Sequence, residues 1–440
     1  MQRLKRALLL PVMLLSACAV APYTRPITEC PDGVTLQADG WWRQFGDPAL
    51  EAVVTESLRC NVDLAKQAIA VERARLTLEQ GDLVPAGVVS DSVEKPLGGG
   101  GAIRLGKAAL SVAYEVDLWG RVRFGRLADY WWTQASEFER QAAALSLSAA
   151  AAGGYWQVAA LTQQRMLARD NVLTLQQLLQ RVDAAVQSGD MAPNALWQLQ
   201  RRMLAEQQHV SELARQQDRA RRDLAQLLDR PSLPDADTVP MPAGALPDIQ
   251  ADLPAALLAR RPDVAASEAR LKQLWAKVGQ AQTEFMPKLT LTGALGGASV
   301  DLARVLSQPA ATLAGSLTLP FVDWRTLDLK RQQAMLAYRE AEQDYRRSVH
   351  QALREVDEVL RLRQKLLAEY AGLQQQWTLA GKSEREAEAR YRAGATGRQD
   401  WYEAQLTRRR LEMQLSANRL SQLQNLAVAY KAFGGAPVAR

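Results

Sequence analysis

The chain has 440 residues, of which 23% are charged, and its formal net charge is +6. A net charge this small relative to the number of charged residues gives no reason to expect nucleic-acid binding. Its two histidines, His209 and His350, each lie on a helical run without metal-ligand spacing to a partner. No nucleophile or nucleotide-binding motif is present. We therefore expect a protein that is not an enzyme and that holds no metal or cofactor.

The N-terminus predicts an export signal over residues 1–17. Arg3, Lys5 and Arg6 precede an apolar run that is too short to span a membrane as a mature anchor. The ending Leu15-Ser16-Ala17-Cys18 resembles the bacterial lipobox, which implies cleavage before Cys18 and a covalent diacylglycerol and N-acyl lipid on it. Ala19, by the same resemblance, favours sorting to the outer membrane. An ordinary signal followed by a chance cysteine is the alternative. Without its three basic residues, the mature chain has 51 basic and 48 acidic residues, a net charge of +3.

After Cys18 the chain has only Cys30 and Cys60. An even number of cysteines in an oxidising compartment favours a disulfide. Such a bond would join the extended leader, residues 18–47, to the first helix. Two free buried thiols are the alternative.

An internal duplication organises the rest of the chain. An offset of 205 residues without a gap places Trp119 on Trp324, Gly189 on Gly394 and Gln217 on Gln422. We expect two structural repeats, 48–230 and 254–433, that together build one object. Five prolines between them, followed by Pro254, predict a connector over 231–253, and Gly434-Gly435 begins a C-terminal tail, 434–440.

Long helices dominate both predicted repeats. Residues 125–187 and 328–392 are proline-free, rich in strong helix formers, and apolar at intervals of three and four. A helix of about 65 residues is roughly 100 Å long, which is typical of coiled-coil packing. Shorter helices are expected over 194–229 and 399–433, and others within 48–82 and 254–284. Taken alone, this pattern also fits a simple antiparallel coiled-coil scaffold.

Four short segments alternate between apolar and polar residues and predict strands near 86–95, 103–117, 287–297 and 311–321. Apolar-out, polar-in strands of about ten residues are typical of outer-membrane barrels. Four strands cannot close a barrel that hides every backbone group from lipid. Several copies of the chain must therefore contribute to one barrel.

Several motifs resemble the outer-membrane factors of bacterial efflux pumps, the TolC-like proteins, and specifically their NodT-type lipoprotein branch. They are Trp41-Trp42-Arg43-Gln44-Phe45-Gly46-Asp47-Pro48-Ala49-Leu50, Asn61-Val62-Asp63-Leu64, Tyr114-Glu115-Val116-Asp117-Leu118-Trp119-Gly120-Arg121, Arg260-Arg261-Pro262-Asp263-Val264 and Phe285-Met286-Pro287-Lys288-Leu289. Phe321-Val322-Asp323-Trp324-Arg325 departs from the glycines usual in the family. The resemblance implies a mainly helical homotrimer, in which a 12-stranded β-barrel, four strands per chain, continues into a long periplasmic α-helical barrel.

The resemblance also implies functional positions at the far end of the helices. The breaks at Gly189 and Gly394, with Ala192 and Gly397, would form the tips on which a periplasmic adaptor protein docks. The alternative is that these are only turns. Asp400 and Glu403, one helical turn apart, would form acidic rings at the periplasmic constriction. Helix capping is the alternative explanation of Asp400.

The sequence therefore predicts an outer-membrane exit duct, anchored by lipid and barrel, that passively conducts substrates from an inner-membrane pump and its adaptor. The alternative is a structural lipoprotein, a coiled-coil spacer between envelope layers that conducts nothing. The two hypotheses differ on the strands, because a spacer needs no apolar alternation at 103–117 and 311–321.

Overall fold

The structure is a computed structural model, which describes residues 40–80, 83–94, 103–233, 241–242, 244, 246–247, 258–299 and 310–435. The expected signal peptide, Cys18, Cys30, most of the connector and the end of the C-terminal tail lie outside these residues. Where the chain is described, the expected class is confirmed: it is mainly helical with one small antiparallel sheet.

The first described elements are a 3-10 helix, η2 (Trp41–Phe45), and two helices, α2 (Pro48–Cys60) and α3 (Val62–Glu79). Asp47 caps α2 by accepting from the amides of Ala49 and Leu50, at 2.9 and 3.2 Å. The helical region predicted over 48–82 is interrupted at Asn61. The Asn61 Oδ1 accepts from the amides of Asp63 and Leu64, both at 3.1 Å, and so starts a new helix.

The sheet has four strands in chain order: β1 (Leu83–Glu94), β2 (Ile103–Val116), β3 (Lys288–Ser299) and β4 (Ala310–Thr318). Each neighbouring pair is antiparallel, and Leu83, Tyr114, Leu291 and Gly315 are successive register partners. The predicted fourth strand was too long at its C-terminal end, because Pro320 lacks an amide donor and opens a 3-10 helix, η4 (Pro320–Asp323).

One face of this sheet is apolar and exposed. Leu110, Val112 and Tyr114 of β2 are exposed, whereas Ser111 and Ala113 between them are half-buried. The register places Leu291 beside Tyr114 and Leu295 beside Leu110, and both leucines are exposed. An apolar face of this kind suits a lipid environment.

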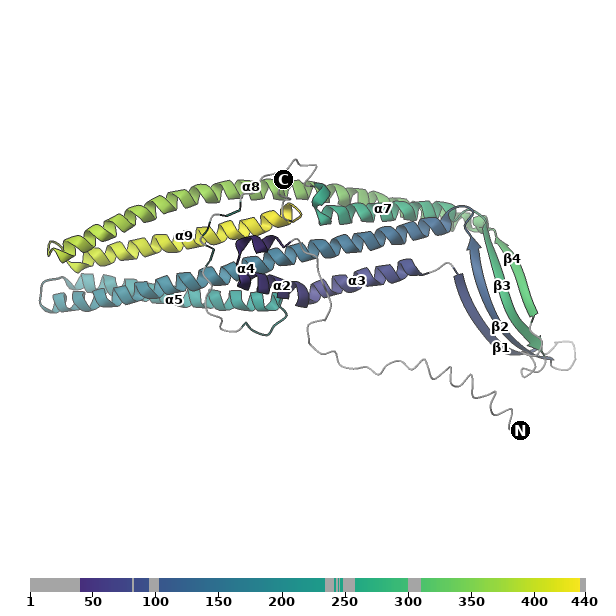
Figure 1. Ribbon diagram of the computed structural model, residues 1–440, viewed down its shortest axis with the longest axis horizontal. Helices are drawn as coiled ribbons and strands as arrows, with labels where there is room; N and C mark the ends of the chain where they lie inside the picture. Colours follow the sequence, from purple (N-terminus) through teal and green to yellow (C-terminus); the bar gives the residue numbers. More distant parts are fainter. Residues whose placement is uncertain are drawn as a thin grey trace, which may run out of the picture. The chain divides into compact units, whose positions relative to one another are not determined.

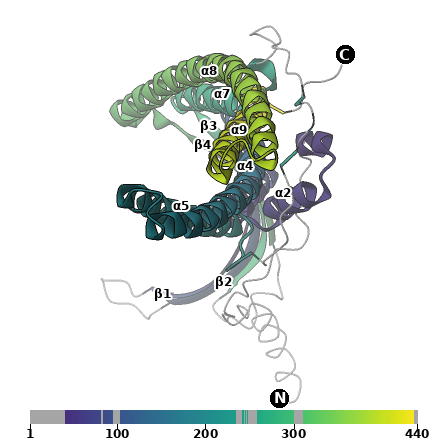
Figure 2. The same ribbon diagram turned by 90° about the vertical axis from the view of Figure 1, so that its left-hand side faces the viewer.

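Five helices complete the fold: α4 (Arg121–Gln187), α5 (Pro193–Leu227), α7 (Pro262–Thr283), α8 (Trp324–Arg392) and α9 (Arg398–Ala432). Next to the sheet they pack in the row α3–α4–α7–α8, and farther away in the row α5–α4–α9–α8 (Figure 1). Seen end-on, α8, α9, α4 and α5 follow an arc, and α2 lies on its convex side (Figure 2). Within the described chain, no helix combines the length and the apolar character that a membrane crossing requires.

The duplication is visible in the element bounds. β1 and β3 begin and end 205 residues apart, and so do α5 and α9. The long helices begin four residues before the predicted positions 125 and 328. At α4 the reason is local: Gly120 adopts a left-handed conformation (φ 82°), and Asp117 accepts from the amides of Val122 and Arg123. Burial raises the pKa of Asp117, but hydrogen bonds from these amides and from the Arg123 side chain outweigh burial and lower it.

The largest apolar core lies midway along the helices and encloses the N-terminal motif. Trp41 stacks on Tyr430 of α9, with ring centroids 4.7 Å apart, and its Nε1 donates to Ser148 of α4 at 3.1 Å. Tyr430 in turn donates to Gln44 at 3.0 Å, and Tyr155 donates to Asp47 at 2.9 Å. The motif therefore joins the start of the described chain to both repeats.

Candidate functional site at the hairpin tips

The two hairpin tips have the same backbone construction. Gly189 and Gly394 adopt left-handed conformations, with φ of 82° and 72°. Immediately after each glycine, an amide donates back to the last helical turn: Asp190 to Ala185 at 2.8 Å, and Ala395 to Arg390 at 2.9 Å. Glycine suits both positions because side chains strain this conformation. Both tips are therefore tight turns between antiparallel helices.

Ala192 and Gly397 occupy equivalent positions just before the returning helices. Each is the N-cap of its helix, with an extended backbone (φ −71° and −69°) and no capping side-chain hydrogen bond. A side chain added at Gly397 would meet open space. These two positions therefore tolerate other residues, unlike Gly189 and Gly394.

Asp400 lies in the first turn of α9, and its side chain is exposed. Among the described residues it makes no hydrogen bond or ion pair, and the N-cap is Gly397. Among the described residues, Asp400 therefore accepts no capping hydrogen bond, while its place in the first turn still puts its charge near the helix N-terminus.

Glu403, in contrast, has a partner that no sequence pattern indicates. The Nη1 of Arg202, on α5, donates to both of its carboxylate oxygens, at 2.6 and 2.8 Å. Both side chains are about two-fifths exposed. The two acidic residues predicted at the constriction are therefore not equivalent. Asp400 has no partner within the described part of the chain, whereas Glu403 is paired across the two repeats.

Aromatic residues surround the base of the second tip. Trp401 stacks between Tyr391 and Tyr402, with interplanar angles of 22° and 12°, and the Arg398 guanidinium lies 5.1 to 5.5 Å from all three rings. Tyr402 is buried against an apolar cluster of Leu175, Leu178, Val182, Leu199 and Leu406.

Polar contacts between α9 and α4 recur at seven-residue intervals above the tip. Tyr402 donates to Gln177 at 2.8 Å, Arg409 to Thr174 at 2.7 Å, and Ser416 to Gln163 at 3.2 Å. The next residue in this series, Leu423, is fully buried in the main apolar core. These heptad positions of α9 thus make polar contacts near the tip, beside the apolar cluster around Tyr402, and an apolar contact farther up.

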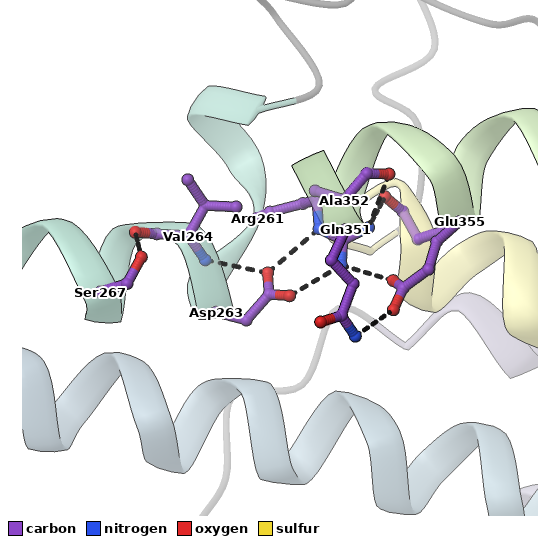
Figure 3. Close-up of polar contacts among 8 residues, drawn as sticks. Arg261, Asp263, Val264, Ser267, Gln351, Ala352 and Glu355 are labelled. Carbon is purple, nitrogen blue, oxygen red and sulfur yellow. Dashed lines mark hydrogen bonds and ion pairs between the residues drawn. The ribbon is translucent and has the colours of Figure 1, made fainter. Parts of the chain in front are cut away.

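A second polar cluster lies at the other end of α9, around Arg261, which is only 2% exposed (Figure 3). Its Nη2 donates to Asp263 at 2.7 Å and to Glu355 of α8 at 2.6 Å. Its Nη1 donates to the carbonyl oxygen of Ala432 of α9 at 3.1 Å. Burial raises the pKa of Asp263, but hydrogen bonds and charge from Arg261 outweigh it and leave that pKa lowered. The Arg-Arg-Pro-Asp-Val motif is visible in the sequence, but this role of Arg261 is not.

The junction between strands and helices carries the motif that runs from Tyr114 to Arg121. Arg121 forms an ion pair with Glu115, and the Nε1 of Trp119 donates to the Pro287 carbonyl oxygen at 3.0 Å. These contacts join the start of α4 to the start of β3. His209 and His350 lie on α5 and α8, and no group of three potential metal ligands occurs within the described part of the chain.

A family described as outer membrane efflux protein matches residues 55–230 and 253–435. The chain belongs to this family. The pyoverdine export outer membrane protein OpmQ of Pseudomonas putida is 31% identical over 412 residues, which cover 90% of this chain and 87% of that relative.

Solved structures agree with this assignment. The open state of the MtrE outer membrane channel of Neisseria gonorrhoeae superimposes with a TM-score of 0.79 at 27% identity, covering 94% of this chain and 98% of that one. The outer-membrane channel OprN has the same TM-score at 24% identity, covering 95% and 99%, and shows the fold alone. As a member of the family, the chain is an outer-membrane exit duct for an efflux system, and its relatives are channels rather than enzymes.

Proposed function

We propose that three copies of the chain form one duct, passive and gated, that receives substrates from an inner-membrane pump through a periplasmic adaptor. The open sheet carries this proposal. β1 and β4 each have only one strand neighbour among the described residues, and an unpaired strand edge is not stable in lipid. Three copies bring twelve strands, an even number within the range of bacterial barrels.

The helices support the same assembly. Beside the four strands, four helices pack in the row α3–α4–α7–α8. The arc of helices in Figure 2 has the form that part of a ring would take. In such a ring, Asp400 would be repeated three times around the axis at the constriction. The carboxylates would favour cations in the opening, while Glu403, held by Arg202, would take part in keeping the tip closed.

We place adaptor docking at Gly189, Ala192, Gly394 and Gly397, because these tips are exposed and the helices behind them are tied together. Cys18 would carry the lipid, and Cys30 would form a disulfide with Cys60, which is buried at the end of α2. Mass spectrometry of the mature N-terminus tests the lipid, and an unmodified N-terminus would exclude it. The non-conducting spacer is the weaker hypothesis, because a spacer has no use for the exposed apolar sheet face.

Single-channel recording in planar bilayers tests the duct directly. We expect discrete conductance steps from the purified protein. The conductance should rise when the contacts that hold the tip are removed. A protein that stays silent under all conditions, including with Arg202→Ala, would support the spacer instead. Export by cells that lack the chain, with and without re-expression, tests the same function in the envelope.

A further inference from the structure

A cavity of about 250 Å³ lies between the 3-10 helix η2, helix α4 and the start of α7. Its inner wall is aromatic and buried, since Trp41 and Trp42 of η2 are 1% and 3% exposed. Its mouth is polar, because Gln141 of α4 and Arg260, just before α7, line the cavity and are exposed. A largely apolar interior with a few polar groups is typical of small-molecule sites.

One polar atom of the inner wall has no partner. The Nε1 of Trp41 donates to Ser148 at 3.1 Å. The Nε1 of its neighbour Trp42 is also buried, but it makes no hydrogen bond among the described residues. Buried indole donors normally have an acceptor. A ligand with an oxygen at its inner end would supply the acceptor that Trp42 lacks.

The lining of the cavity carries an excess of positive charge. The Nε and Nη2 of Arg140 donate to Glu137 at 3.2 and 2.6 Å, while its Nη1 makes no hydrogen bond among the described residues. Glu137 also lies 3.9 Å from Arg75, so one carboxylate is shared between two guanidinium groups. Arg260 adds a further guanidinium, and no described residue that lines the cavity has a carboxylate. The complementary ligand is therefore an anion.

The segment after α9 closes one wall of the cavity. Gly434 lines it, and a Cβ at this position would lie only 2.6 Å from the carbonyl oxygen of Arg260. The close approach of the two backbones therefore requires glycine. A bound ligand would contact η2 and parts of both repeats at once, so its binding should stabilise the folded chain.

The cavity lies on the outer side of the arc of helices. Helix η2 packs on α2, and α2 lies on the convex side of the arc (Figure 2). Trp41 reaches Ser148 of α4 from that side, so α4 separates the cavity from the concave side. In the proposed ring the concave side faces the interior of the duct. A ligand of this cavity would therefore arrive from the periplasm and is not the cargo of the duct.

We propose that this cavity binds a small aromatic carboxylate that carries a second oxygen at the opposite end of its ring system. The ring would lie against Trp41 and Trp42, whose faces suit an aromatic ligand. The carboxylate would accept from Arg140 and Arg260, and the second oxygen would accept from the Nε1 of Trp42. A volume below that of drug-sized sites limits the ligand to one or two rings. Binding at this site does not require conduction, so its test is independent of the duct.

Calorimetric titration of the full-length protein in a non-ionic detergent tests the site, with para-hydroxybenzoate as the probe. We expect saturable binding of one molecule per chain. Benzoate lacks the second oxygen and para-hydroxybenzamide lacks the charge, so each should bind about tenfold more weakly. Arg260→Gln, at an exposed position, and Trp42→Phe should cause losses of similar size. Trp156→Phe is the matched control, because the Nε1 of Trp156 is also buried without a partner among the described residues but Trp156 does not line the cavity.

Thermal unfolding provides a second measurement. Saturating para-hydroxybenzoate should raise the melting temperature of the wild type and of Trp156→Phe, but not that of Arg260→Gln. The proposal is overturned if no saturable binding occurs at millimolar concentration, or if para-hydroxybenzamide binds as tightly as the acid. Wild-type affinity in both Arg260→Gln and Trp42→Phe would overturn it as well. Equal block of single-channel conductance in the wild type and in Arg260→Gln would place the ligand inside the duct and would exclude this site.

Discussion

Glu403 of α9 and Arg202 of α5 form an ion pair in which one guanidinium nitrogen reaches both carboxylate oxygens. The pair joins the second repeat to the first within one copy, close to the tips. Since both side chains are partly exposed, its contribution to the closed arrangement is about 0.2–1 kcal/mol. It is therefore a contact that can open without unfolding either hairpin.

We expect Arg202→Ala or Glu403→Ala to raise the ratio of open to closed channels by up to roughly fivefold. Single-channel open probability measures this change. The exchanged pair, Arg202→Glu with Glu403→Arg, should return toward the wild-type value. If each single variant keeps wild-type gating, the ion pair does not hold the tip.

Asp400 should dominate the cation preference of the opening, because it is exposed and unpaired within the described chain whereas Glu403 is neutralised by Arg202. We expect Asp400→Asn to reduce cation selectivity, measured as the reversal potential in a salt gradient. Glu403→Gln should change it less. Wild-type selectivity in Asp400→Asn would show that this carboxylate does not line the pore.

Bulky residues at the tips should impair adaptor docking while leaving folding intact. Ala192→Trp and Gly397→Trp fit extended backbone positions, so we expect trimers and conductance to persist while export and adaptor pull-down fall. Gly189→Ala is a contrasting variant. Because Gly189 has a left-handed backbone, an alanine at this position strains the turn itself. Undiminished export with both tryptophans present would argue against docking at these tips.

Removal of the buried Arg261 guanidinium, at the other end of α9, should lower the stability of the fold far more than the changes at the tips. Arg261→Ala leaves Asp263 and Glu355 without their shared partner, and we expect a loss of about 3 kcal/mol in the free energy of unfolding. Both carboxylates are partly exposed, which keeps the expected loss at the lower end of the range for buried pairs. Denaturant unfolding followed by circular dichroism measures it. Arg361→Ala, which removes an exposed ion pair with Asp357, is the control and should change stability by under about 1 kcal/mol.

The cluster around Arg261 should make the stability of the fold depend on pH in the acidic range. The pKa of Asp263 in the folded chain lies below its ordinary value of 3.8. Its contribution is therefore fully present above that value and is lost as the pH falls through the folded pKa. Melting temperatures measured from pH 6 down to about pH 3 should fall less steeply in Asp263→Asn than in the wild type. Parallel curves would indicate that the carboxylate makes no such contribution.

The elements could be predicted because their signals are local. Proline-free runs with apolar residues at helical spacing marked α4 and α8, and alternation marked the strands. The errors lie where side chains decide an end: Asn61 restarts a helix, Asp117 and Gly120 begin α4 early, and Pro320 ends β4. Capping and turn contacts depend on individual hydrogen bonds that periodicity does not register.

The candidate site could be predicted only in part. The positions of Gly189 and Gly394 followed from the duplication, and the acidic pair from the family resemblance. The contacts from Arg202 to Glu403 and from Tyr402 to Gln177 join residues about 200 positions apart, so no local pattern announces them. The seven-residue spacing of Tyr402, Arg409 and Ser416 was the available signal, because it marks one face of α9.

The stack of Trp41 on Tyr430 has a consequence for biosynthesis. The hydrogen bond from Tyr430 to Gln44 spans 386 positions of sequence, so the central core can form only after nearly the whole polypeptide has been delivered. A chain that ended before α9 would leave the ring of Trp41 without its stacking partner, and would expose to water the part of the core that Leu423 and Leu426 of α9 cover. Incomplete polypeptides therefore differ from complete ones in a feature that envelope chaperones and proteases recognise, namely unburied aromatic surface. Closure of Trp41 and Gln44 onto α9 is thus a test of completeness built into the fold.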